Sequence, residues 1–577
     1  MLFGEKGVEL RKFSGNNLFI FLFLSVGFYL FLIMPKIAKP IAGWEICTWE
    51  VARSIAQNGP AAVKFFYLPP LYASLIALSF KLFGISEISA RIIGVVCFIA
   101  VQAVICLLIK EISVNKKESS LGGIIALSVF VASAAAVQGS LVIDHPDTTL
   151  FMLLASLFYL FLFKTERLAF GARVFWLGLL YALCLWAKMT TALSFLIALP
   201  LAFVLSGERK KAVNLSLGVF LWGIALFLLS WFSYCYFIAG TSRFVEPFSY
   251  YAMNTADSFF VGLFEKIARI ALDMFRISVW FSPFLLILGI AAIFDILKNA
   301  RREENKKIVH LAVFSFIVII GYLSANATFS SFPKYVAPVL PMLSCVIACY
   351  GAGLFREGIN QKSSGAWILC LAGGVIYYFL LTGDLVYEIF LLRQAQLLGT
   401  VEAYLYRIPA KSVLYFGFLL VFVSVSKKFL SVSLNKRVVL GIFTALIASN
   451  VAVSLAQRKA DYSLNYAYGA KGVEQLKKFL KEKAPLEVFT TTEGVIANIE
   501  GVSFSGASVG AWDSPRAFLD FMDKRRPRAF LYGLPTNNIA QLKRIIYSPE
   551  VKSFFKKYYK EYVFGSYIML TRNVYYD

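Results

Sequence analysis

The sequence predicts a polytopic α-helical membrane protein that ends in a small α/β domain. Three observations support this fold class. Hydrophobic residues make up 59% of the 577 residues, charged residues only 16%, and the mean hydropathy is +0.70, whereas soluble domains carry roughly a quarter charged residues. Apolar runs near the length of a spanning helix recur along the chain. The tail from 458 to 577 instead alternates helix-like and strand-like segments.

The first elements fix the orientation of the chain. The apolar run 17–35 follows Lys6, Arg11 and Lys12, which predicts a cytoplasmic N-terminus. The next run, 71–84, is short and contains Lys81. If it spanned the membrane, every later basic loop would lie outside. We therefore predict that 71–84 lies on the membrane surface, in an outer loop of residues 36–91.

The remaining apolar runs complete a prediction of about thirteen transmembrane helices. An odd number of spans places the C-terminal tail outside. The chain thus divides into a membrane domain, 1–457, and an outer domain, 458–577. The predicted spans are 17–35, 91–110, 121–141, 148–164, 172–187, 189–206, 212–238, 275–297, 308–326, 335–355, 366–383, 411–427 and 438–456.

The tail has the pattern of an α/β domain. Residues 473–483 have helical spacing with lysines on the polar side, and 515–524 form a second expected helix. Residues 486–491 and 529–532 are the expected strands. Alternation of helix and strand predicts a helix-on-sheet arrangement.

The charge balance excludes one class of function. The formal net charge is +23, which is typical of nucleic-acid binding but also of the cytoplasmic loops of membrane proteins. The predicted topology places most of the basic excess in cytoplasmic segments, so no nucleic-acid partner is expected. The eight cysteines and two histidines form no CxxC pair and no Cys/His cluster. No metal or other cofactor is therefore expected.

Carboxylates beside the outer ends of spans are the first candidate site residues. Glu45 lies in the outer loop, and Asp144 and Asp147 lie between the third and fourth predicted spans. Charges next to a bilayer are costly unless they are solvated or functional. Asp147 also fits as an N-cap of the fourth span, so capping and catalysis both remain open for it.

Cations on the same face are the second set. They are Lys64, Lys188, Arg243 and Lys334, the last followed by Tyr335. Each alone can be explained as a side chain that reaches toward lipid headgroups. Several of them facing carboxylates could instead hold a phosphate.

Four blocks in order give the chain a family resemblance. They are 45–53 (EICTWEVAR), 68–72 (LPPLY) continued by 82–91 (LFGISEISAR), 144–150 (DHPDTTL) and 334–341 (KYVAPVLP). Together they resemble the GT-C glycosyltransferases of the protein O-mannosyltransferase superfamily. The most similar branch is the bacterial one that contains the aminoarabinose lipid A transferase.

Two departures from the family pattern concern the site. Trp44 stands where the family has an Asp before Glu45, and Leu68 stands where the family often has a Lys. The resemblance leaves Glu45 as the carboxylate of the first loop. It does not decide between Asp144 and Asp147.

The resemblance implies a reaction at the outer face of a bacterial inner membrane. An inverting glycosyltransferase would move a hexose or pentose from an undecaprenyl-type polyprenyl phosphate to a lipid A-like lipid or another acceptor. Glu45, with Asp144 or Asp147, would act on the acceptor hydroxyl. Arg243, Lys334 and Tyr335, with Lys64 and Lys188, would bind the donor phosphate.

Three alternatives remain open from the sequence. An enzyme of the same fold could glycosylate a protein. A transporter or flippase of lipid-linked sugars is also possible, although no inverted repeat is evident. A binding protein that works through its C-terminal domain is the third.

Overall fold

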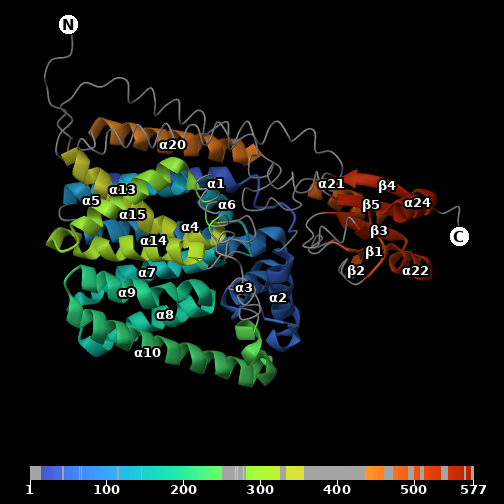
Figure 1. The fold of residues 1–577 in the computed structure, drawn as a ribbon, viewed down its shortest axis with the longest axis horizontal. Helices are drawn as coiled ribbons and strands as arrows, with labels where there is room; N and C mark the ends of the chain where they lie inside the picture. The colour runs from blue at the N-terminus through green and yellow to red at the C-terminus, as the bar shows by residue number, and fades with distance from the viewer. Residues whose placement is uncertain are drawn as a thin grey trace, which may run out of the picture.

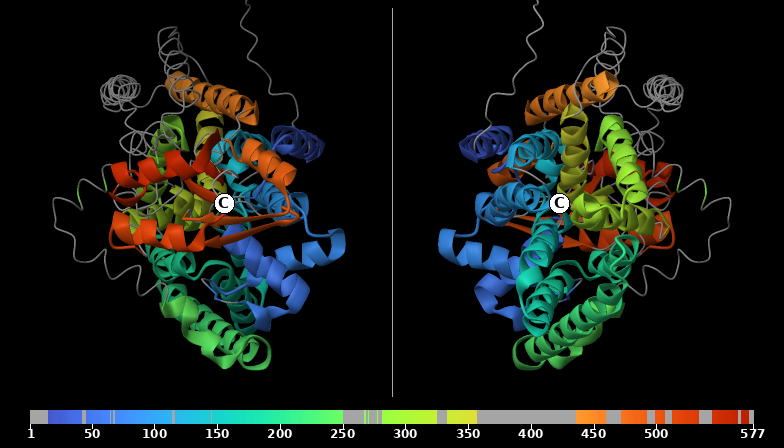
Figure 2. Two further views of the ribbon diagram at one scale, coloured as in Figure 1. Left: turned by 90° about the vertical axis from the view of Figure 1, so that its right-hand side faces the viewer. Right: turned by 90° about the vertical axis from the view of Figure 1, so that its left-hand side faces the viewer.

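The computed structural model consists of a helix bundle with a β-sheet at one end (Figure 1). The sheet lies over the end of the bundle when the molecule is seen end-on (Figure 2). The residues that the structure describes are 15–41, 45–63, 65–66, 68–113, 116–144, 146–249, 281–324, 333–356, 436–459, 472–491, 499–506, 512–533, 544–564 and 567–573, with 267, 270 and 277.

The bundle is built from long apolar helices, as predicted. Its helices are α1 (Gly15–Ile33), α2 (Glu45–Asn58), α3 (Leu71–Phe83), α4 (Glu87–Ile112), α5 (Lys116–Ala132), α6 (Ala134–Gly139), α7 (Leu150–Lys164), α8 (Phe170–Ala192), α9 (Ser194–Leu205), α10 (Arg209–Tyr234), α13 (Pro283–Lys298), α14 (Lys306–Ser324), α15 (Leu340–Arg356) and α20 (Lys436–Lys459).

Within the described ranges, five helices are long and apolar enough to cross a membrane. They are Glu87–Ile112, Phe170–Ala192, Arg209–Ala239, Glu303–Leu323 and Tyr335–Gly353. The chain is a multi-pass membrane protein. The number of thirteen spans stays a prediction, because the predicted spans 366–383 and 411–427 lie outside the described residues.

Two predicted spans contain interruptions. The helix expected over 121–141 ends at Ala132, and α6 starts anew behind Ser133, whose hydroxyl accepts the Ala136 N–H. The span expected from 335 begins as a 3-10 turn, η7 (Pro333–Val339). Pro338 within η7 has no backbone N–H to donate to an α-helical bond.

The segment between α1 and α4 forms two short helices. Figure 1 shows α2 and α3 running across the direction of the long helices at the end nearest the sheet. Trp49 and Ala52 of α2 are buried, and the Trp49 ring contacts the Phe80 ring of α3 at 4.9 Å between centroids. With 13 residues, α3 is too short to span a bilayer, which agrees with the predicted surface position.

A close backbone approach holds α4 against the segment 139–149. A Cβ added at Gly94 would lie 2.2 Å from the backbone oxygen of Ser140, and one at Gly139 would lie 2.9 Å from the Thr148 Cβ. A side chain larger than hydrogen at Gly94 would push α4 away from Ser140, and one at Gly139 would push Gly139 away from Thr148 within the acidic segment itself. The glycines therefore let the acidic segment pack directly on α4.

The C-terminal sheet has five strands in the order β2-β1-β3-β5-β4. Strand β1 (Leu486–Thr490) is parallel to β2 (Val502–Gly506) and β3 (Ala529–Gly533), and β5 (Tyr567–Arg572) is antiparallel to β3 and to β4 (Tyr559–Phe564). The sequence predicted β1 and β3, and also the helices α21 (Val473–Lys483) and α22 (Pro515–Arg525). It missed β2, β4, β5 and α24 (Pro549–Tyr558).

Helices cover both faces of this sheet. Phe489 and Phe530 pack with residues of α22 and α24, whereas Val488, Ala529 and Leu531 pack with residues of α21. Neighbouring residues of a strand point to opposite faces, so α21 lies on one face and the other two helices lie on the opposite face. The predicted α/β arrangement is confirmed as a mixed sheet.

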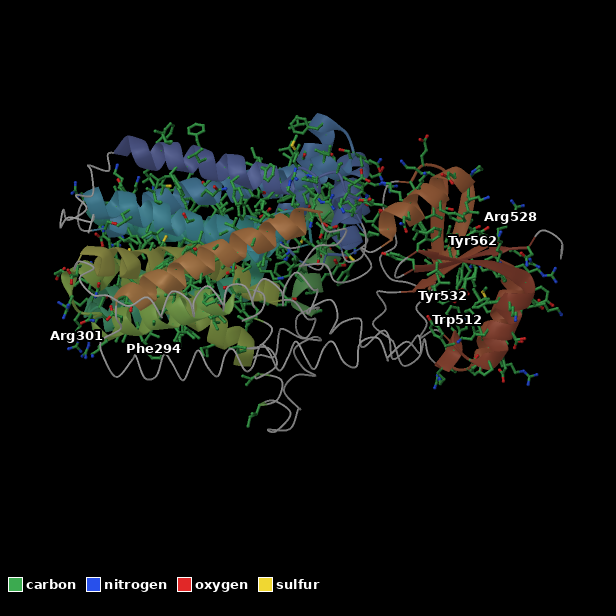
Figure 3. All side chains as sticks on the ribbon, turned by 90° about the horizontal axis from the view of Figure 1, so that it is seen from above. Phe294, Arg301, Trp512, Arg528, Tyr532 and Tyr562 are labelled. Atoms are coloured by element: carbon green, nitrogen blue, oxygen red, sulfur yellow. The ribbon has the colours of Figure 1, made fainter. Side chains whose placement is uncertain are left out.

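The ends of the bundle differ as the predicted topology requires. Figure 3 shows Phe294 and Arg301 at the end of the bundle far from Trp512 and Tyr532 of the C-terminal sheet. The sequence places the loop around Arg301 in the cytoplasm and the C-terminal tail outside. The orientation itself stays a prediction, but these two segments do lie at opposite ends of the molecule.

Candidate functional site

Glu45, the predicted carboxylate of the outer loop, forms a buried ion pair. It is the first residue of α2 and is only 6% exposed. An Nη2 proton of Arg91 is donated to its Oε2 at 3.3 Å, and the Ile143 backbone N–H is donated to its Oε1 at 3.1 Å. Both carboxylate oxygens therefore accept hydrogen bonds within the protein.

The Arg91 side chain connects its own helix α4 to two other parts of the chain. Besides Glu45, its guanidinium donates to the carbonyl oxygens of Leu141 and Ile37, both at 3.0 Å, and to that of Lys39. Guanidinium donors have a fixed planar geometry. One side chain on the second turn of α4 thus holds the segments 37–45 and 141–143 together.

The electrostatics of Glu45 follow from this burial. Burial raises the pKa of Glu45 above its usual value, and the Asp144 charge acts in the same direction. The positive charge of Arg91 and the Ile143 N–H oppose the increase. The carboxylate is held by its partners in a site from which water is largely excluded.

Asp144 directly follows Ile143, whose backbone N–H is hydrogen-bonded to Glu45. Its side chain is partly exposed, unlike that of Glu45. Asp147 lies in the 3-10 turn η2 (Pro146–Thr148), but its side chain is outside the described part of the structure. Helix α7 begins at Leu150 and its N-cap residue is Thr149, whose side chain makes no cap hydrogen bond. The N-cap position is thus two residues after Asp147, the residue at which the sequence had suggested it.

Two of the predicted cationic and aromatic residues lie together. The Lys188 ammonium is 5.0 Å from the centroid of the Tyr335 ring, and the Tyr335 ring stacks on Tyr322 at 5.1 Å. The Tyr322 hydroxyl in turn forms a short hydrogen bond with Thr191. Lys188 is 7% exposed and has non-helical backbone angles of φ −159° and ψ 93°, so it marks a break inside α8.

The acidic segment and this aromatic cluster belong to one neighbourhood. Turn η2 packs against η7, which carries Tyr335, and against α8, which carries Lys188. Three segments far apart in the sequence therefore meet at the ends of α4, α7 and α8. A cation held against an aromatic ring at this junction is chemically able to bind an anionic group.

Arg243 has a carboxylate partner that the sequence analysis did not single out. Its Nη1 lies 2.6 Å from Oε1 of Glu246, and the Phe66 backbone N–H donates to Oε2 of Glu246 at 3.0 Å. Arg243 lies in the short turn η5 (Thr241–Val245) after α10, and Phe66 packs on Trp231 of α10. Glu246 thus ties Phe66 to the turn that follows α10.

The other predicted ligands cannot be placed. Lys64 lies outside the described residues, and of Lys334 only the backbone in η7 is described. Among the described residues, no group of three or more His, Cys, Asp or Glu side chains is placed to hold a metal ion.

The sequence analysis assigned no role to Arg91 and Glu246. A weak signal for Arg91 was present, because it ends the motif block 82–91. Glu246 had no local signal, because its partner Phe66 is 180 positions away.

The fold defines the class of the protein as a multi-pass helical membrane protein with a C-terminal mixed sheet. Over the whole chain it is similar to ArnT from Cupriavidus metallidurans bound to undecaprenyl phosphate, with a TM-score of 0.52, 13% identity, and coverage of 97% of this chain and 99% of that one.

The same protein in the apo state gives a TM-score of 0.47 with 12% identity, 96% of this chain and 97% of that one. The oligosaccharyltransferase AglB from Archaeoglobus fulgidus, in complex with an inhibitory peptide and a dolichol-phosphate, gives 0.47 with 10% identity, 97% of this chain and 74% of that one. Neither of these two values supports an argument by itself.

Residues 68–234 match the family model described as dolichyl-phosphate-mannose-protein mannosyltransferase. No curated protein matches the chain. The family resemblance read from the motifs is confirmed, and the matched segment contains the Pro-Pro block, the acidic segment and Lys188. In its fold and in this matched segment the chain is thus similar to membrane glycosyltransferases of the GT-C class.

Proposed function

We propose that the chain transfers a sugar from undecaprenyl phosphate to a lipid A-like lipid at the periplasmic face of a bacterial inner membrane. In this arrangement the N-terminus is cytoplasmic and the domain 458–577 is periplasmic. The observation that carries the proposal is the packing of η2 against η7 and α8. It places the turn 146–148, two residues after Asp144, against the elements that carry Lys188 and Tyr335.

Asp144 is the better candidate for the base than Glu45. Both oxygens of Glu45 accept hydrogen bonds in a buried pair with Arg91 and Ile143. A general base needs a lone pair that can reach the proton of the substrate. Glu45 then positions the acidic segment, and the partly exposed Asp144 takes the proton. Asp147 remains an alternative base.

The proposed transfer needs no reactant beyond the donor and the acceptor. The acceptor oxygen loses its proton to Asp144 and forms a bond to the anomeric carbon of the sugar, with inversion. The bond from that carbon to the phosphate oxygen breaks, and polyprenyl phosphate leaves with the electron pair. Lys188, with the Tyr335 hydroxyl and the cations Arg243, Lys334 and Lys64, stabilises the charge on the phosphate.

Substitution of the carboxylates tests this assignment. Loss of a general base costs typically about 10²–10⁴ in rate, so Asp144→Asn should lower kcat by about that factor in transfer from undecaprenyl-phosphate sugars. Asp147→Asn is the matched comparison. Wild-type kcat in Asp144→Asn and a large loss in Asp147→Asn would move the role to Asp147.

A protein acceptor is the second candidate, because the matching family model describes protein mannosyltransferases. Purified enzyme with one labelled donor would be offered lipid A and an unfolded Ser/Thr-rich peptide in parallel. Label in the peptide alone would overturn the lipid acceptor while it leaves the donor and the site intact.

A further inference from the structure

Helix α21 of the C-terminal sheet domain has two different faces. Val473, Leu476 and Leu480 are buried against the sheet. The opposite face carries charged residues at spacings of three and four, among them Glu474 and Lys477, and lines a cavity of about 650 Å³ together with residues of the bundle. The junction between the domain and the bundle is therefore polar.

Two ion pairs cross this junction. Lys477 pairs with Glu87, and these side chains are only 14% and 13% exposed. Lys39 pairs with Glu474 at 3.5 Å, with exposures of 24% and 57%. A pair that is mostly withdrawn from solvent is less screened than an exposed one, so Lys477–Glu87 is the stronger contact.

Both pairs end at residues that support Arg91. Glu87 is the first residue of α4, whose start is fixed by a capping box between Ser86 and Ser89, and Arg91 follows one turn later on the same helix. Lys39 supplies a backbone carbonyl oxygen that accepts a hydrogen bond from Arg91. One docking point thus supplies a hydrogen-bond acceptor to the guanidinium that holds Glu45, and the other lies one turn before Arg91 on the same helix.

We propose that the C-terminal domain positions the acidic segment through these contacts, with Lys39, Glu87, Glu474 and Lys477 as positioning residues. Docking of the domain fixes the position of the backbone at 37–39 and of the first turn of α4, and these two elements orient Arg91. Arg91 in turn holds the Glu45 carboxylate. Glu45 then holds the Ile143 N–H, which is next to Asp144. The effect on catalysis rests on the proposed function, whereas the effect on the Ile143 hydrogen bond does not.

Charge reversal and charge exchange test this coupling in the full-length protein in nanodiscs. Lys477→Glu should increase the hydrogen-exchange rate of peptides that cover 141–144 and lower kcat by about tenfold, a typical coupling between contacting groups. The KM for the donor should stay unchanged, because Lys188 and Tyr335 are not touched. Combining Lys477→Glu with Glu87→Lys should restore both the wild-type hydrogen-exchange rate and most of kcat.

Lys483→Glu is the matched control. It makes the same charge change at the exposed last residue of α21, away from the residues that line the cavity, and should leave exchange and kcat at wild-type values. A wild-type hydrogen-exchange rate at 141–144 in Lys477→Glu would overturn the coupling. A double variant Lys477→Glu/Glu87→Lys that does not regain the wild-type hydrogen-exchange rate would also overturn it. If exchange responds as expected but the wild type transfers no sugar, the coupling stands and the proposed function fails.

Discussion

Two arginine–carboxylate pairs near the proposed site differ in burial. Arg91 and Glu45 have side chains that are 5% and 7% exposed, whereas Arg243 and Glu246 are 23% and 15% exposed. A buried pair cannot exchange its partner for a ligand without leaving a charge in a water-poor environment. A partly exposed pair can open at lower cost. The comparison favours a positioning role for Arg91, whereas the proposed role of Arg243 at the donor phosphate requires its pair to open.

Arg91→Met should have the largest effect on folding. It leaves Glu45 buried without its cation and removes the donors to three backbone carbonyls. Removal of one partner of a buried pair costs about 3–5 kcal/mol. The measurement is the thermal unfolding midpoint of the detergent-solubilised protein. A midpoint equal to that of the wild type would show that the pair does not hold these segments together.

Arg243→Ala should act on the donor instead. A hydrogen bond to a charged group is worth about 1.5–3 kcal/mol, so kcat/KM for the undecaprenyl-phosphate sugar should fall by roughly tenfold to a hundredfold. The unfolding midpoint should change little. Arg243→Lys, which keeps the charge, should recover part of the activity. A large loss of stability with unchanged kcat/KM would make Arg243 a second structural arginine.

Glu45→Gln should change how stability depends on pH. Burial raises the pKa of Glu45 in the folded state. A raised carboxyl pKa stabilises the fold at pH values below the unfolded pKa, and this contribution is lost as the pH rises through the folded pKa. The unfolding free energy of the wild type should therefore fall more steeply with rising pH than that of Glu45→Gln. Denaturant titrations of both proteins over the same pH range measure the difference, and parallel curves would contradict it.

The smallest effect should come from an exposed pair. Lys211 and Glu208 lie 2.8 Å apart at the start of α10, with exposures of 42% and 25%. Exposed pairs contribute about 0–1 kcal/mol, so Lys211→Ala should leave both the unfolding midpoint and kcat near wild-type values. A clear loss of stability would mean that burial does not rank the pairs of this protein.

The sequence predicted the elements whose pattern is local. The helix α21 was predicted with its observed ends, because its apolar and charged residues alternate with a helical period. The spans 148–164 and 212–238 correspond to α7 and α10, because a long apolar run is enough to identify them. The strands β2, β4 and β5 were missed. Residues 502–505 of β2 do alternate apolar and polar side chains, so that signal was present and was overlooked, whereas β4 and β5 lack a clear alternation.

The site was predicted only in part, for a related reason. Its residues were identified by type and by the family resemblance, and their roles stay a prediction. In the structure, Lys188 and Tyr335 lie together. The partners were not predictable, because Glu45 finds Arg91 46 positions away and the Ile143 N–H 98 positions away. Such pairing depends on how helices pack and not on any pattern within a single segment.

The break in α8 at Lys188 limits what this stretch of backbone can face. Backbone groups freed from a helix at membrane depth are tolerated only where they face protein or water, because hydrocarbon offers no hydrogen-bond partner. Lys188 is buried among protein residues. The first helical piece also ends at this point, and a helix end carries partial negative charge. A positive charge on Lys188 is therefore electrostatically favoured at this point of the chain, independently of any ligand.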